Sequence, residues 1–204
     1  MAFKASPVSS SARVATSAKT IEMSGREQRA APTQSFNELA DTHIALARKP
    51  RAESVAALNQ LLVDTMTLRD LYKKHHWQTS GATFYQLHLL FDKHHAEQSA
   101  LIDDIAERIQ TLGGIAIAMA ADVAETTMLA RPPKDREHPS VQLARFVVAH
   151  ERILLSARAA ARHAAEFGDD GTNDLLVSDV IRTNERQAWF IHEQLQDNRI
   201  SLVQ

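Results

Sequence analysis

The stretch HWQTSGATFYQLHLLFDKHHAEQSALIDDIAERIQTLGG, residues 76–114, decides the fold. Between Thr83 and Leu112 it contains no glycine or proline, and Gly113-Gly114 then ends the run. Apolar side chains recur at helical spacing through it: Leu87, Leu90, Phe91, Leu101, Ile105, Ile109 and Leu112. The pattern predicts one long amphipathic helix over about residues 83–112, with glycine where helices commonly end.

Three more helical segments surround this one. The same spacing predicts helices over about 52–78, 139–168 and 172–201. A long connection, 114–138, separates the second helix from the third, with room for a short helix in its alanine-rich part. Another short helix is expected after Ser35, ending before Lys49-Pro50, so that 35–51 form a short helix and linker. No strand-like alternation or internal repeat appears. The fold class is therefore all-α, a ferritin-like four-helix bundle over 52–204.

Composition narrows the function classes. The 204 residues suit one domain plus a tail, and the absence of cysteine excludes disulfides, thiolate metal sites and a cysteine nucleophile. No apolar run is long enough to span a membrane. A net charge of −2 means that any nucleic-acid contact must come from a local basic segment.

Residues 1–34 are such a segment. With few apolar anchors, they are interpreted as a flexible tail. Five basic residues against Glu22 and Glu27 give the tail a net charge of +3 (5 − 2): Lys4, Arg13, Lys19, Arg26 and Arg29. DNA binding, a transit peptide and packing on an assembly remain open for this tail.

Ten histidines are present, and several lie close to acids. His88 and Asp92, and also Asp103 and Glu107, are pairs four residues apart on one helix face. The pairs share a stripe but lie about 16 Å apart along the axis, too far to bind one ion. Two antiparallel copies of the helix would bring the first pair of one to the second pair of the other, giving two equivalent intersubunit sites. His76 could complete each site.

Imidazole and carboxylate donors suit iron, zinc or manganese. An isolated His/Asp pair is usually a solvated ion pair, and His94 and His95 are interpreted in that way. The sequence contains no Glu-x-x-His, so a di-iron centre inside one bundle is not expected.

These residues resemble the Dps family, the mini-ferritins known as DNA-binding proteins from starved cells. The resemblance spans about 52–204 and is densest over 76–114. It is carried by His76-Trp77-Gln78-Thr79-Ser80-Gly81, Phe84, His88, Asp92, Asp103-Asp104-Ile105-Ala106-Glu107-Arg108 and Leu112-Gly113-Gly114. Thr172-Asn173-Asp174-Leu175-Leu176 and Trp189 are similar to the family's last helix.

The resemblance implies a hollow dodecameric shell that oxidises iron(II), usually with hydrogen peroxide, and stores the product as mineral. It implies that His76, His88 and Asp92 come from one subunit and Asp103 and Glu107 from its two-fold mate. Trp77 and Trp189 would lie near the iron, either as electron donors or as core filling. Asp170 and Asp174 would line an entry pore, or else cap a helix. A cytoplasmic, nucleoid-associated location follows from the same resemblance.

Two other functions stay open at this point. The protein could mainly compact DNA, with metal binding secondary. It could also be a transport shell for zinc or another metal without redox turnover, because the same ligands bind several divalent ions.

Overall fold

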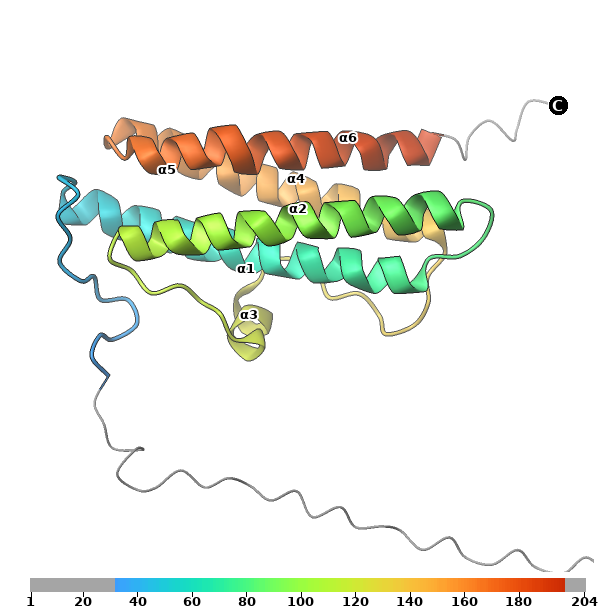
Figure 1. The fold of residues 1–204 in the computed structure, drawn as a ribbon, viewed down its shortest axis with the longest axis horizontal. Helices are drawn as coiled ribbons and strands as arrows, with labels where there is room; N and C mark the ends of the chain where they lie inside the picture. The colour runs from blue at the N-terminus through green and yellow to red at the C-terminus, as the bar shows by residue number, and fades with distance from the viewer. Residues whose placement is uncertain (1–31, 197–204) are drawn as a thin grey trace, which may run out of the picture. The chain divides into compact units, whose positions relative to one another are not determined.

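The computed structural model describes residues 32–196, and its long helices lie side by side in a bundle (Figure 1). Helices α1 (Arg48–Gln78) and α2 (Phe84–Thr111) form one hairpin. Helix α4 (Pro139–Glu166) packs on the chain's last helical stretch, which comprises α5 (Asp170–Asp174), the π-helix η2 (Leu175–Ile181) and α6 (Arg182–Gln196). The expected all-α, ferritin-like bundle is confirmed, and none of the described helices is long and apolar enough to cross a membrane.

The core fills the space between these helices. Apolar residues from every long helix are less than one-tenth exposed, among them Leu62, Phe91, Ile105, Phe146 and Val180. Because burying each such side chain stabilises the fold by about 2 kcal/mol, this core is the main source of stability.

The connection between α2 and α4 carries the expected short helix, α3 (Ala120–Thr126). Polar side chains of α1 bind the chain on both sides of α3. The Asn59 side chain donates to the Ile115 carbonyl at 3.0 Å and accepts from the Ile117 amide at 2.9 Å. The Asp64 carboxylate accepts from the Met128 amide at 2.7 Å. These bonds satisfy backbone groups that a loop would otherwise leave without partners.

The expected short helix between Ser35 and Lys49-Pro50 is wrong. Residues 34–46 form turns, bends and irregular chain, and α1 already begins at Arg48, with Pro50 inside its first turn. Proline fits there because the first amides of a helix have no partner within it. The preceding segment is held instead by two contacts at Ala40: its amide donates to the Gly113 carbonyl just after α2 at 2.8 Å, and its carbonyl accepts from buried Arg51 of α1 at 3.1 Å.

The last helical stretch is continuous but not uniformly α-helical. Sequence periodicity predicts one helix over 172–201, whereas the structure has seven π-helical residues, Leu175–Ile181, between α5 and α6. The predicted end beyond Gln196 lies outside the described residues. In the first turn of α6, buried Asn184 donates a hydrogen bond from its side-chain amide to the Val180 carbonyl at 2.8 Å. The wider turns therefore set which α6 side chains face the core.

A buried ion pair locks the end of α2 to the start of α5. Asp169 is the N-cap of α5 and accepts from the Thr172 amide at 3.1 Å. Its carboxylate also accepts from the Ser54 hydroxyl at 2.6 Å and pairs with the Arg108 guanidinium. Three segments distant in sequence thus meet on one carboxylate.

Candidate metal centre

The candidate centre begins with two histidines, one from each arm of the α1–α2 hairpin. The rings of His76 and His88 stack with their centroids 3.7 Å apart. His76 Nδ1 lies 2.8 Å from the His88 carbonyl, and His88 Nδ1 lies 2.9 Å from the His76 carbonyl. His76 lies in the last turn of α1, whose carbonyls have no partner within the helix, so its oxygen is free to accept.

This reciprocal pairing fixes the chemistry of both rings. A nitrogen bonded to a carbonyl oxygen must carry the hydrogen, so both Nδ1 atoms are donors. In the neutral rings the Nε2 atoms therefore hold the lone pairs that a metal ion requires. Ring orientation through a backbone carbonyl is the usual support of metal-binding histidines.

Asp92 lies beside this pair on α2. Its Oδ1 is 3.9 Å from His76 Nδ1 and 2.6 Å from Lys73 Nζ, and its side chain is 51% exposed. The Lys73 ammonium holds the pKa of the Asp92 carboxyl below its usual range. The carboxylate is therefore charged at neutral pH. The Lys73 ammonium is bound to it and would compete with a metal ion for it.

Asp103 and Glu107 lie on the exposed surface of α2, toward its other end. Because α2 is unbroken from Phe84 to Thr111, the eleven residues from Asp92 to Asp103 span about 16 Å. Over residues 32–196 no three His, Cys, Asp or Glu side chains are close enough to hold a metal ion. The structure thus brings His76 and His88 into contact, with Asp92 Oδ1 3.9 Å from His76 Nδ1, and leaves Asp103 and Glu107 apart from them on α2.

The two tryptophans are not core residues. Trp77 is 69% exposed and Trp189 is 59% exposed, so their interpretation as core filling is wrong. The Trp189 indole donates to Glu193 Oε1 at 3.1 Å. Trp77 directly follows His76 and lies on the surface of the single chain.

Asp170 and Asp174 do not cap the last helix, because Asp169 does. Asp170 is the first residue of α5 and is exposed. Asp174 is also exposed and accepts from the Ser178 hydroxyl at 2.8 Å. Their capping interpretation is therefore wrong, and both carboxylates face solvent in the single chain.

The interpretation of His94 as a solvated surface residue is also wrong. His94 is fully buried, and so are His75 and His150, whereas His95 is half-buried. Burial lowers the pKa of His94 to about 3 and that of His75 and His150 to about 4, so all three rings are neutral. His94 continues the buried stripe of α2 from Leu87 and Phe91, and that position was the sequence signal for its burial.

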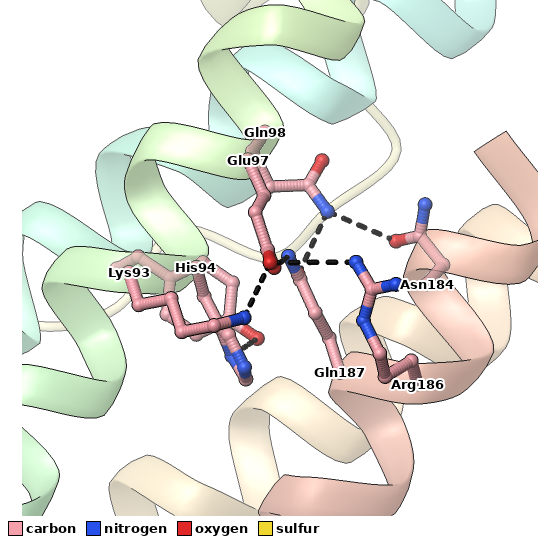
Figure 2. Close-up of polar contacts among 8 residues, drawn as sticks. Lys93, His94, Glu97, Gln98, Asn184, Arg186 and Gln187 are labelled. Carbon is pink, nitrogen blue, oxygen red and sulfur yellow. Dashed lines mark hydrogen bonds and ion pairs between the residues drawn. The ribbon is translucent and has the colours of Figure 1, made fainter. Parts of the chain in front are cut away.

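Figure 2 shows the polar contacts between α2 and α6 in the neighbourhood of His94. Gln98 donates to Gln187 Oε1 at 2.9 Å and to Asn184 Oδ1 at 3.3 Å, across the interface of α2 and α6. Gln187 donates to Glu97 Oε2 at 2.7 Å. At the surface Glu97 pairs with Lys93 and Arg186. The bundle therefore contains a polar layer in its interior, separate from the histidine pair.

Comparisons with known proteins show which proteins this chain is similar to. The Ferritin family model, described as the ferritin-like domain, matches residues 55–200. DpsC from Streptomyces coelicolor is 52% identical, with a TM-score of 0.80 over 81% of this chain and 96% of that one. An uncharacterized protein of Kitasatospora aureofaciens is 46% identical over 70% of this chain and 95% of its own. A nutrient stress-induced DNA-binding protein of Nostoc is 30% identical over 81% of this chain and 90% of its own.

The fold and the match to the family model together show that this is a ferritin-like protein. Within that class, the relatives at high identity and coverage are decisive. The chain belongs to the Dps family.

Proposed function

We propose that the protein oxidises iron(II) with hydrogen peroxide at sites shared by two subunits, and stores the ferric product inside a dodecameric shell. The observation that carries the proposal is the His76–His88 pair, whose Nδ1 atoms are engaged and whose Nε2 atoms hold free lone pairs beside Asp92. The second half-site, Asp103 and Glu107, faces solvent, and within residues 32–196 no further His, Cys, Asp or Glu completes it, which supports completion by another copy.

Each group has a role in this chemistry. The carboxylates of Asp92, Asp103 and Glu107 hold iron(II) and neutralise the charge that it gains on oxidation. The neutral imidazoles add donor strength without adding charge. Two iron(II) ions supply the two electrons that reduce one peroxide, with two protons, to two waters, and this two-electron route forms no hydroxyl radical. Trp77 and Trp189 are proposed to stand near this site as auxiliary electron donors.

Two measurements on the wild-type chain test the proposal. Light scattering should give the mass of a dodecamer of a 22.7 kDa chain. Addition of peroxide to iron(II) and the protein should give the ferric absorbance, with about one peroxide consumed for every two iron ions. Metal binding without oxidation would favour the zinc-transport alternative, and a stable monomer would count against a shell of either kind.

Lys73 is expected to weaken metal binding, because its ammonium already pairs with Asp92 at 2.6 Å. Lys73→Ala should tighten zinc binding by about 5-fold, the effect of a partly exposed ion pair worth about 1 kcal/mol. Zinc is the suitable probe because it does not turn over, and calorimetric titration measures its affinity. Lys74→Ala, which removes contacts to Gln78 and Asp135 instead, is the matched control.

Iron entry is proposed to use Asp170 and Asp174, which are exposed near the start of the last helix. An acidic constriction raises the local cation concentration and therefore the entry rate, more strongly at low salt. Asn at both positions should slow iron uptake several-fold while oxidation at saturating iron is unchanged. Equal uptake rates for the variant and the wild type would exclude a pore role.

DNA binding is the second candidate function, favoured by the Nostoc relative, which is named for it. The residues that would bind, Lys4, Arg13, Lys19, Arg26 and Arg29, lie outside the described part of the chain. A shell would display many copies of this +3 segment, so weak phosphate contacts could add up to useful avidity. Residence in the cytoplasm with the nucleoid is part of this proposal.

Deletion of residues 1–34 separates this function from iron chemistry. We expect the shell and its iron oxidation to persist while DNA retardation in a gel is lost. Retardation by the full-length protein should fall steeply as salt rises, because phosphate contacts release counterions. If the full-length protein fails to retard DNA even at low salt, the DNA role is wrong and the iron function stands alone.

A further inference from the structure

Tyr72 lies in the buried polar layer, at a distance from bulk solvent and outside the proposed iron ligands. Its side chain is fully buried, and its hydroxyl lies 2.5 Å from His150 Nε2 and 3.1 Å from His94 Nδ1. Both histidines are themselves fully buried. The phenol therefore has two imidazoles as immediate neighbours, from α4 and α2.

The direction of each of these hydrogen bonds follows from the partners. The Asn184 amide nitrogen donates to the Val180 carbonyl, which leaves Asn184 Oδ1 as the acceptor facing His150 Nδ1 at 2.9 Å. His150 Nδ1 therefore carries the hydrogen, and in the neutral ring Nε2 holds a lone pair. The Tyr72 hydroxyl donates to that lone pair. Because a phenol has one hydrogen, the contact to His94 must be a donation from His94 Nδ1 to the phenolic oxygen.

We propose that Tyr72 is a buried one-electron donor that quenches strong oxidants formed when peroxide meets iron(II) one electron at a time. In this step a hydroxyl-radical-type oxidant takes one electron and becomes hydroxide. Tyr72 loses that electron, and its phenolic proton moves along the existing hydrogen bond to His150 Nε2. The products are a neutral tyrosyl radical and an imidazolium. The inference rests on the proposed iron chemistry for its oxidant.

Three features of the surroundings support the step. Burial raises the pKa of Tyr72, so the phenol keeps its proton until the electron leaves. The His94 Nδ1–H remains to stabilise the radical oxygen, and Asn184 Oδ1 accepts from the new imidazolium. Tyr72 is also one helical turn before His76 on α1, about 6 Å along the axis from the proposed iron ligand.

The aromatic packing around Tyr72 protects the radical. The Phe146 ring stacks on it with centroids 4.1 Å apart, and the Phe91 ring lies 6.0 Å away. Neither ring carries a transferable hydrogen bound to oxygen or nitrogen. The radical would thus be held away from solvent and from other copies of the protein, whereas the exposed Tyr85 lacks such cover.

The composition of the chain makes the test direct, because Tyr72 and Tyr85 are its two tyrosines. Full-length Tyr85→Phe protein is mixed with iron(II) and peroxide, frozen within milliseconds and examined by electron paramagnetic resonance. We expect a tyrosyl signal with the wild-type intensity and with couplings to exchangeable protons that vanish in D2O. In Tyr72→Phe protein the signal should fall at least 10-fold while the initial rate of iron oxidation stays unchanged.

Each other outcome is decisive. A tyrosyl signal absent from Tyr85→Phe, or equally strong in Tyr72→Phe, overturns the inference even when iron is oxidised normally. The Tyr85→Phe result stands whether or not the core variant folds, since Tyr85 is 67% exposed. If the wild type does not oxidise iron, the proposed function fails. A photogenerated one-electron oxidant applied to the same proteins then decides Tyr72 separately, by the same signal.

Discussion

Replacing Asp103 and Glu107 together by alanine is expected to slow peroxide-driven iron(II) oxidation by about 100-fold, since even supporting residues of metal sites are worth 10–100-fold. Both carboxylates are exposed in the single chain, so their loss should leave the fold and the assembly intact. Stopped-flow absorbance at limiting iron measures the rate. A double alanine variant of two exposed carboxylates of α4, Glu151 and Glu166, controls for the lost charge.

The same variants can show that each site belongs to two chains. A variant lacking His88 and Asp92 and a variant lacking Asp103 and Glu107 should each be inactive alone. In a mixed two-fold dimer, one of the two sites receives both intact halves, and the other receives neither. Random co-assembly should therefore recover roughly a quarter of the wild-type oxidation rate. No recovery in verified mixed shells would show that the five residues do not form an intersubunit site.

Asp169→Ala is expected to cause the largest loss of stability. The substitution leaves the Arg108 guanidinium, which is 20% exposed, without its buried partner, and removes the N-cap of α5 and the acceptor of the Ser54 hydroxyl. Breaking a buried pair costs about 3 kcal/mol, which lowers the melting temperature by about 6–12 °C in a chain of this size. Calorimetry of the assembled protein measures the shift.

Asp170→Ala is the matched control, because the neighbouring carboxylate is exposed. The dependence of the stability difference on acid pH gives a second test of the role of Asp169. Burial raises the pKa of Asp169, but its hydrogen bonds from Ser54 and Thr172 and the Arg108 charge outweigh this and hold the pKa below its usual value. Its stabilisation is thus fully present above about pH 4 and disappears as the pH falls through the lowered pKa. The wild type and the variant should converge in stability there, and a constant difference would contradict this assignment.

The regular parts of the fold could be predicted from sequence because they depend on apolar periodicity. The run from Thr83 to Leu112 predicts α2 almost to the residue. The start of α1 could not be predicted, because the preceding segment is held in irregular form by the bonds of Ala40 to Arg51 and to Gly113, which is distant in sequence. Such contacts leave no local pattern.

The candidate site also has a part that sequence spacing could predict and a part that it could not. Helical spacing placed His88 with Asp92 and separated both from Asp103, and the described structure has this arrangement. The intersubunit ligand set itself stays a proposal. The burial of His94 was missed although its spacing from Leu87 and Phe91 indicated it, because a histidine beside lysine and histidine in sequence resembles a surface residue. Its partner Tyr72 comes from another helix and was visible only in three dimensions.

The π-helix Leu175–Ile181 accommodates one extra residue in the last helical stretch. Its wider turns hold more residues than α-turns of the same rise. If the same residues formed an uninterrupted α-helix, every later side chain would rotate by about 100° about the axis. Asn184 and Gln187 would then swing out of the interior, and exposed residues such as Trp189 would change direction with them. Relatives with one residue fewer in this segment should therefore have a plain α-helix there, with the same α6 side chains facing inward.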